Sequence, residues 1–297
     1  MKRLIAFLAA SLAAFIMSAA PAPITKDYNL KGFTGLHVSG LVSVELTKAP
    51  DWKVSVTLPP ELEEYLVVKT VGGNLSISLN NVPAKVLRRF RDLEIKAEIA
   101  MPELRTLEMS GATSLSCGDT FDIGSETFKI EASGASKVKQ LGINAKELRA
   151  QISGATGVNL SGSFGKVYSQ VSGAAKCVFD VEAETLTEEI SGAAKVYNTG
   201  EYNDVNVEAS GASVFSVKGS ADRMGLSGSG ASKMELFGCE VAKVKVDLSG
   251  AAYCEVNASE SIDVNVNAAA SLRYKDNPDV VVNTGNIGRG ASVQRVK

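Results

Sequence analysis

The sequence is 297 residues long, and its 31 basic and 33 acidic side chains give a formal net charge of −2, which offers no basic surface for nucleic acid. Its 27 glycines, 8 prolines and 6% aromatic residues suit closely stacked strands better than helices. A single histidine excludes a histidine-rich zinc site.

The first 22 residues have the layout of a secretory signal peptide. Met1-Lys2-Arg3 is followed by an uncharged stretch over residues 4–17 and by small residues at positions 18–20. The stretch is shorter than the roughly 20 residues that a membrane span needs, and no second apolar run follows. We therefore expect residues 1–22 to be removed on export, a location in the periplasm or at the cell surface, and no transmembrane segment in the mature chain.

Residues 23–105 contain short strand patterns separated by Pro59-Pro60 and Gly72-Gly73. We interpret them as irregular β coils that open a larger structure, and a separate small β domain is the alternative. A polar insertion is expected over residues 80–91. The expected strands cover residues 35–46, 53–57, 66–70 and 74–79.

Residues 106–297 repeat the tripeptide Ser-Gly-Ala at regular intervals, which predicts one structural unit per repeat. A ninth copy is Asn267-Ala268-Ala269, a degenerate tenth is Arg289-Gly290-Ala291, and an early relative is Ser39-Gly40. The eight complete copies, 19 to 23 residues apart, begin at Ser110, Ser133, Ser153, Ser172, Ser191, Ser210, Ser229 and Ser249.

Apolar residues recur at every second position on both sides of this corner, which indicates two strands per repeat with one buried face each. Counted from the serine, positions −5, −1 and +5 are apolar, as in Val205, Ala209 and Phe215, and Gly228 is an exception at −1. Two strands cannot close a core, so the repeats must cover one another. The prediction is an all-β, right-handed parallel β-helix, or solenoid, with two main strands per coil of about 19–20 residues and rungs about 4.8 Å apart.

Each residue of the corner has an expected role. Glycine reaches backbone angles that other residues avoid. The alanine at +2 is expected to sit inside the bend, where a larger side chain would overpack. The serine hydroxyl is expected to hydrogen-bond to nearby backbone.

The signal peptide, the opening Gly32-Phe33-Thr34-Gly35-Leu36-His37-Val38-Ser39-Gly40 and the run of Ser-Gly-Ala corners occur together. In combination they resemble the putative auto-transporter adhesin, head GIN domain family, a domain of unknown function common in Bacteroidetes. The resemblance covers nearly all of the mature chain. It implies a shape similar to pectin-lyase-type β-helices, no catalytic residues and a role in cell adhesion. No membrane-barrel segment follows the last repeat, so direct anchoring in the outer membrane is not expected.

No catalytic, cofactor-binding or metal-binding residue is expected. The corner serines form a row of hydroxyls, but a serine nucleophile needs a base. The one histidine, His37, is far from the main repeats in sequence and is expected at the surface. The acidic residues, including the pair Glu188 and Glu189, are expected on solvated faces, without the clustering that calcium loops or glycoside hydrolysis require.

The four cysteines are expected to be buried free thiols. Cys177 and Cys254 share an inward column four rungs apart, about 19 Å at the strand spacing. A disulfide needs Cα atoms within about 7 Å, so these two cannot pair. Cys239 and Cys254 lie on opposite strands of their coils, and Cys117 has no evident partner.

Two sets of side chains on the repeats are candidates for ligand contacts. A column of lysines at +4 would suit anionic glycans or lipid headgroups, although exposed lysines commonly serve solubility. Tyrosines could stack on sugars, but they are too dispersed to define a site. The lysines are Lys137, Lys176, Lys195 and Lys233, and the tyrosines are Tyr168, Tyr197, Tyr202 and Tyr253.

The sequence therefore predicts a secreted, non-catalytic β-solenoid that serves as a cell-surface or periplasmic adhesin or binding scaffold without a cofactor. The expected partner is a glycan or a cell-surface protein, contacted through repeated weak interactions. Open solenoid ends also allow a homo-oligomer. Two alternatives stay open: a carbohydrate-active enzyme on a pectin-lyase-like β-helix, and a self-assembling structural protein.

Overall fold

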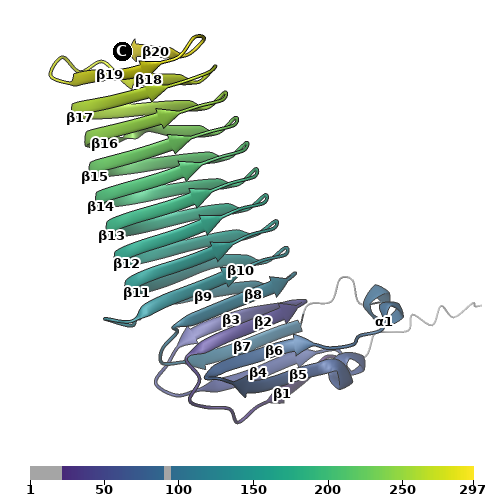
Figure 1. Cartoon of the computed structure of the whole chain (residues 1–297). Helices are drawn as coiled ribbons and strands as arrows, with labels where there is room; N and C mark the ends of the chain where they lie inside the picture. Colours follow the sequence, from purple (N-terminus) through teal and green to yellow (C-terminus); the bar gives the residue numbers. More distant parts are fainter. Residues whose placement is uncertain (1–21, 90–94) are drawn as a thin grey trace, which may run out of the picture.

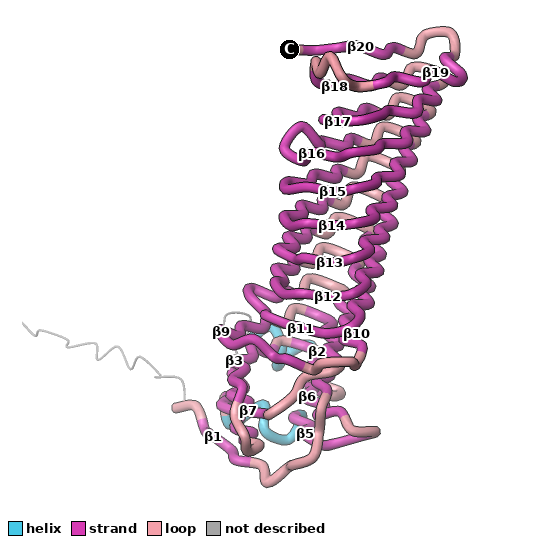
Figure 2. Tube along the Cα trace, turned by 90° about the vertical axis from the view of Figure 1, so that its left-hand side faces the viewer, coloured by secondary structure: helices cyan, strands magenta, loops and turns pink. Residues whose placement is uncertain are grey.

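The computed structural model describes residues 22–297 except 90–94, so the expected signal peptide lies outside the described residues apart from Ala22. The described residues form twenty strands, one 3-10 helix and one α-helix, and the strands join in one continuous sheet. Parallel coils stack into a rod of about ten turns (Figure 1). Figure 2 shows the two sides of each coil as opposed faces of the rod. The predicted parallel β-solenoid is confirmed.

Each regular coil is one bent strand of 14 to 16 residues that runs from one corner to the next. The two predicted strand arms are therefore continuous through the bend. Adjacent coils pair in parallel with equivalent positions in register, for example Val196 beside Phe215. The regular coils are β11 (Lys137–Ile152), β12 (Gly157–Val171), β13 (Lys176–Ile190), β14 (Lys195–Ala209), β15 (Val214–Gly228), β16 (Lys233–Leu248) and β17 (Tyr253–Val266).

The inward columns are those that the alternation predicted. Val205, Ala209 and Phe215 are each at most 3% exposed and belong to one core that follows the rod. Gly228 interrupts the −1 column because Met234 Cε and Leu248 Cδ2 lie 2.7 and 2.8 Å from the position its Cβ would take. Neighbouring core side chains therefore fill the space that glycine leaves.

The corner glycines have φ angles between +69° and +79° in the eight complete copies. A Cβ on Gly192 would lie 2.8 Å from the carbonyl oxygen of Gly173 in the preceding coil. The flanking N–H groups of Ser191 and Ala193 donate to the carbonyls of Val171 and Gly173 at 2.9 and 2.8 Å. Both the backbone conformation and the close approach of stacked corners thus require glycine.

The residue inside the corner is at +3, so the expectation for the alanine at +2 is wrong. Ala193 is exposed, whereas Ala194 is fully buried. The left-handed glycine turns the chain so that the +2 side chain faces solvent and the next one faces the core. The small +3 residues are Thr113, Ser136, Thr156, Ala175, Ala194, Ser213, Ser232, Ala252 and Ala270.

The irregular copies of the corner keep the same backbone geometry. Ala268 occupies the glycine position of the ninth corner with φ +61°, and Gly290 of the tenth has φ +86°. Gly40, with φ +97°, lies beside Gly111 in the register. The early, ninth and tenth copies are therefore corners of the same stack.

Ala268→Gly is expected to raise the free energy of unfolding by about 0.5–1 kcal/mol. Release from the left-handed conformation is worth about 1–2 kcal/mol, and the larger entropy of glycine in the unfolded chain offsets roughly half of that. Urea denaturation measures the change. Ala269→Gly, without a positive φ to relieve, is the control and is expected to destabilise. A destabilised Ala268→Gly protein would mean that the ninth corner holds no strain.

The first parallel coil lies before residue 105. It consists of β2 (Gly35–Gly40) and β3 (Val42–Lys48), which pair with β8 (Thr106–Gly111) and β9 (Ser114–Asp122). The strand expected over residues 35–46 is thus divided by a corner. Hydrogen bonding continues across residue 105, and the domain boundaries expected there stay a prediction.

Further strands extend both faces at the N-terminal end, and some are antiparallel (Figure 1). β6 (Asn74–Leu79) lies parallel to β2, and β7 (Ile95–Met101) lies parallel to β3. β5 (Leu66–Val71) pairs antiparallel with β6, and β4 (Lys53–Leu58) pairs antiparallel with β7 and with β1 (Ile24–Asp27). This end of the stack therefore departs from the coil pattern that the repeats follow.

Two short helices and four short strands complete the fold. The double-proline break begins the 3-10 helix η1 (Pro60–Tyr65). The expected polar insertion contains α1 (Ala84–Arg89), and its final residues, 90 and 91, lie outside the described residues. The remaining strands are β10 (Thr127–Ala132), β18 (Ser271–Lys275), β19 (Val281–Ile287) and β20 (Ser292–Val296).

All four cysteines are free and buried, as predicted. Cys177 and Cys254 are 0% exposed and occupy the same inward position of their coils. Burial raises the pKa of both thiols, and it raises the pKa of Cys239 to about 11. These side chains therefore pack as small apolar groups.

Candidate ligand-binding groove

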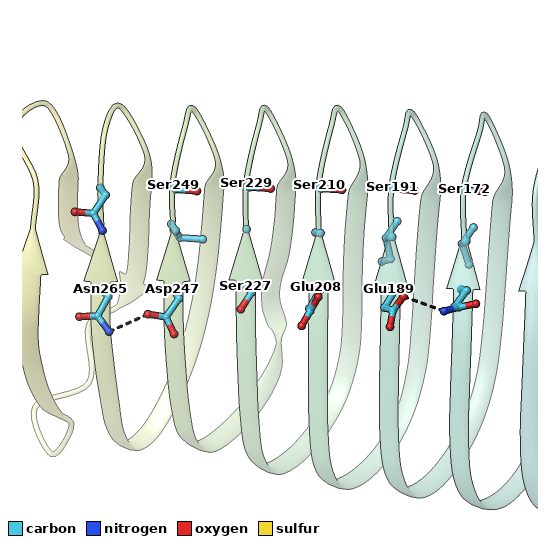
Figure 3. A pocket seen from close by; sticks show the side chains of 17 residues that line it. Ser172, Glu189, Ser191, Glu208, Ser210, Ser227, Ser229, Asp247, Ser249 and Asn265 are labelled. Atoms are coloured by element: carbon cyan, nitrogen blue, oxygen red, sulfur yellow. Dashed lines mark hydrogen bonds between the residues drawn. The ribbon is translucent and has the colours of Figure 1, made fainter.

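A polar groove runs beside the row of corners. Its larger part encloses about 680 Å³ and follows the coils from Gln170 to Asn267. One wall is the outward column at −2, and the other is the row of corner serines (Figure 3). The −2 wall contains Gln170, Glu189, Glu208, Ser227, Asp247 and Asn265, and the serine wall contains Ser172, Ser191, Ser210, Ser229 and Ser249.

A second hollow of about 380 Å³ extends the groove toward the N-terminal end. It shares Gln170 and Ser172 with the first hollow. The sheet register places each −2 residue beside the next, so the column is unbroken between the two hollows. Its −2 residues are His37, Glu108, Glu131, Gln151 and Gln170.

Hydrogen bonds connect neighbouring rungs along the −2 wall. Gln170 Nε2 donates to Glu189 Oε2 at 2.9 Å, and Asn265 Nδ2 donates to Asp247 Oδ1 at 2.8 Å (Figure 3). Between these pairs Glu208 is exposed. The −2 wall of the two hollows is acidic, because it carries the carboxylates of Glu108, Glu131, Glu189, Glu208 and Asp247.

The corner hydroxyls line the groove, and the expectation that they bond to backbone stays a prediction. Ser191 contacts the preceding coil through its N–H group, which donates to the carbonyl of Val171 at 2.9 Å. Its hydroxyl lies on the groove side of the corner (Figure 3). The corner serines thus present a row of donors and acceptors to a ligand.

His37 lies at the N-terminal end of the groove, much nearer the repeats than its sequence position indicated. β2 places it beside Glu108 of β8, and His37 Nδ1 lies 2.8 Å from Glu108 Oε2. Its side chain is 47% exposed, as expected for a surface residue. Within the described residues the partner of this imidazole is the Glu108 carboxylate.

The lysine column at +4 lies on the other arm of the coils and is exposed, as the pattern predicted. Lys176 Nζ lies 5.7 Å from the centroid of the Tyr197 ring, and Lys233 Nζ lies 5.8 Å from that of Tyr253. Val214 occupies the same column between them. The positive charge is therefore interrupted, and two of the expected stacking tyrosines, Tyr197 and Tyr253, are only half-exposed.

Glu188 lies in the core, so the expectation of a solvated Glu188 and Glu189 pair is wrong for its first member. Glu188 is 0% exposed, whereas Glu189 lines the groove. Successive side chains of a strand point to opposite faces, and strict use of that alternation would have placed Glu188 inside. Across the coil interior Asn198 Nδ2 donates to Glu188 Oε2 at 3.0 Å.

Glu188 belongs to a small polar cluster inside the apolar core. Burial raises the pKa of Glu188 to about 7, although the neighbouring Asn198 and Ser169 side chains oppose the rise. Burial, together with the charge of Glu188, also raises the pKa of Tyr202, which is 4% exposed and unable to stack on a ligand. Among the described residues, the atoms without a hydrogen-bond partner include Glu188 Oε1, Ser169 Oγ, Asn198 Oδ1 and Tyr202 Oη.

The acidic wall does not converge on a single point. Its carboxylates follow one another from rung to rung, about 4.8 Å apart. Over the described parts of the chain, no three His, Cys, Asp or Glu side chains are grouped to hold a metal ion. None of the described helices is long and apolar enough to cross a membrane.

Solved structures share this fold. A putative adhesin from Parabacteroides distasonis gives a TM-score of 0.55 at 17% identity, over 92% of this chain and 97% of that chain. A putative lipid binding protein from the same species and a putative adhesin from Parabacteroides merdae each give 0.51 at 16% identity, over 93% of this chain and 97% of theirs. At such low identity the likeness shows the fold alone. No curated protein matches the chain.

A family model matches the coils themselves. The model described as putative auto-transporter adhesin, head GIN domain, covers residues 32–199 and again residues 175–278. The two matches overlap by about one coil and together span both the opening coils and the regular repeats. They confirm the resemblance carried by the corners, and the chain belongs to the putative auto-transporter adhesin, head GIN domain family.

Proposed function

We propose that the protein is an exported, non-catalytic adhesin that binds a linear, uncharged polysaccharide along the groove. The observation that carries the proposal is repetition: each of the eight complete copies adds one −2 side chain and one corner serine to the walls. The rungs are about 4.8 Å apart, a spacing comparable to one pyranose unit of an extended chain. Successive sugars would thus meet equivalent polar groups, and many weak contacts would add up.

The chemistry of the walls favours hydroxyl-rich ligands. Carboxylates such as Glu189 and Glu208 accept hydrogen bonds from hydroxyls, while Ser191 and Ser210 both donate and accept. The same carboxylates repel anionic polysaccharides and nucleic acid. One related structure is described as a lipid binding protein, but polar walls suit sugar hydroxyls better than acyl chains.

The family and the sequence support the remaining parts of the proposal. Membership in an adhesin family supports a binding role at the periplasm or cell surface, and the expected signal peptide supports export. A row of carboxylates differs from the pair that flanks a scissile bond in glycoside hydrolases, which argues against the enzyme alternative.

The test places the same bulky residue inside and outside the groove on one strand. Ser227 lies in the −2 wall and Ser216 on the other arm of β15. Ser227→Tyr is expected to weaken polysaccharide binding about tenfold or more, equivalent to about 1.4 kcal/mol, because the ring fills the groove. Ser216→Tyr is expected to bind like the wild type.

The measurement is affinity electrophoresis of the purified protein in gels containing xylan, mixed-linkage glucan, glucomannan or polygalacturonate. Retardation by a neutral polymer that Ser227→Tyr abolishes supports the proposal. Retardation by none of the neutral polymers, a preference for polygalacturonate, or equal binding by Ser227→Tyr contradicts it. New reducing ends in the same mixtures would instead support the enzyme alternative.

A further inference from the structure

A third hollow opens from the groove where its two parts meet. It encloses about 470 Å³ and is lined by residues of three successive coils. Gln170 lines all three hollows, so this space is continuous with the groove and broadens it on one side. The side chains that border it include Arg149, Gln151, Tyr168, Gln170, Thr187 and Glu189.

Tyr168 is the exposed aromatic side chain of this hollow. Tyr168 is 40% exposed. Every other aromatic residue in the described parts of the chain is buried or half-buried. It stands at position −4, between Arg149 and Thr187 of the neighbouring coils. Single exposed aromatic side chains are common on protein surfaces, and Tyr168 is distinguished by its place in the lining of a hollow that adjoins the polar groove.

Neighbouring charges hold the ring in place. The Arg149 guanidinium carbon lies 5.6 Å from the centroid of the Tyr168 ring. Arg149 also forms an ion pair with Glu147, which balances its charge. The guanidinium thus supports the ring without making the hollow a site for anions.

The surrounding polar groups match the edge of a sugar ring. Gln151 and Gln170 follow one another in the −2 column next to Tyr168, and Gln170 donates to Glu189 at 2.9 Å. These amides and this carboxylate offer both donors and acceptors to hydroxyls. The C–H face of a pyranose is apolar and packs on an aromatic face, as ligand sites combine apolar contact with a few polar groups.

We propose that Tyr168, with Gln151 and Gln170, forms a subsite that takes one pyranose ring of the polysaccharide. The inference rests on the proposed function and names the point of tightest contact in the groove. The other rungs align the chain, and Tyr168 supplies the stacking contact that fixes its register.

The test compares two tyrosines on opposite arms. Isothermal titration with cellohexaose and xylohexaose is carried out on the wild type, Tyr168→Ala, Tyr168→Phe and Tyr197→Ala. Tyr168→Ala is expected to weaken binding about tenfold, while Tyr168→Phe, which keeps the ring, stays within about threefold. Tyr197→Ala, on the other arm, is expected to bind as the wild type does. Gln170→Ala provides a second variant of the hollow with Tyr168 intact, and a loss of about tenfold is expected there as well.

The outcomes separate this inference from the proposed function. If the wild type binds a hexasaccharide, and both Tyr168→Ala and Gln170→Ala bind it with the affinity of the wild type, the proposed subsite is wrong, while the proposal of a polysaccharide-binding groove stands. An equal loss in Tyr197→Ala also overturns the subsite, since it would place the ligand elsewhere. If neither hexasaccharide binds the wild type and no neutral polymer retards it, the proposed function fails and the subsite with it.

Discussion

Replacing Gly192 by alanine is expected to lower the free energy of unfolding by roughly 2–5 kcal/mol. Gly192 has φ +71°, a conformation that strains alanine, and a Cβ there would lie 2.8 Å from the carbonyl oxygen of Gly173. The contacted atom is backbone of a stacked coil and cannot rotate away. The two corners must therefore move apart and weaken the hydrogen bonds that join them. Urea denaturation followed by far-ultraviolet circular dichroism measures the loss.

The two residues after Gly192 provide matched controls. Ala193→Ser changes an exposed side chain and is expected to stay within about 0.5 kcal/mol of the wild type. Ala194→Leu adds atoms at a fully buried position and is expected to cost about 1–3 kcal/mol. If Gly192→Ala proved as stable as Ala193→Ser, the close stacking of the corners would be refuted.

At pH 8 the variant Glu188→Gln is expected to be more stable than the wild type by about 3 kcal/mol. The folded protein raises the pKa of Glu188 from its ordinary value of 4.5 to about 7, because burial disfavours the carboxylate. Between those pH values the folded state keeps a proton that the unfolded state has lost. The contribution of Glu188 to the free energy of unfolding of the wild type therefore falls as the pH rises from about 4.5 to about 7, and the penalty from this group is complete above that range.

Glutamine removes this penalty while keeping the shape of the side chain. Its amide can also donate to acceptors of the cluster, since Asn198 Oδ1, Ser169 Oγ and Tyr202 Oη have no partner among the described residues. Burial raises the pKa of Cys177 and of Tyr202 above the ordinary values, so neither group ionises over this pH range. The change in stability is thus assigned to Glu188.

Denaturation curves recorded from pH 4 to pH 9 test this expectation. The difference between Glu188→Gln and the wild type should grow between about pH 4.5 and pH 7 and then level off. Glu189→Gln, which changes the adjacent groove residue, is the control and should follow the wild type. Parallel curves for all three proteins would mean that Glu188 is not buried as a proton-binding group in the folded state.

The coil architecture was predictable because it depends on local rules. A residue at every second position faces the core, which is why Val205, Ala209 and Phe215 were assigned correctly. The glycine corner was predictable for the same reason, since a positive φ is a property of one residue. Two predictions within those rules were wrong. The charge of Glu188 indicated a solvated position, although the alternation places this residue inward. The small size of the corner alanine indicated a place inside the bend, although its side chain points outward.

The sequence by itself thus determined the period of the coils, the inward columns and the glycine corners, because each follows from backbone geometry within one repeat. The tertiary structure decided which outward columns form a site, because that depends on the register between coils. Stacking brings His37 beside Glu108 and continues the same wall to Asn265. The corner between β13 and β14 brings Asn198 across the coil interior to Glu188. No pattern within a repeat encodes the neighbours along the wall, since they meet only when the coils are laid on one another.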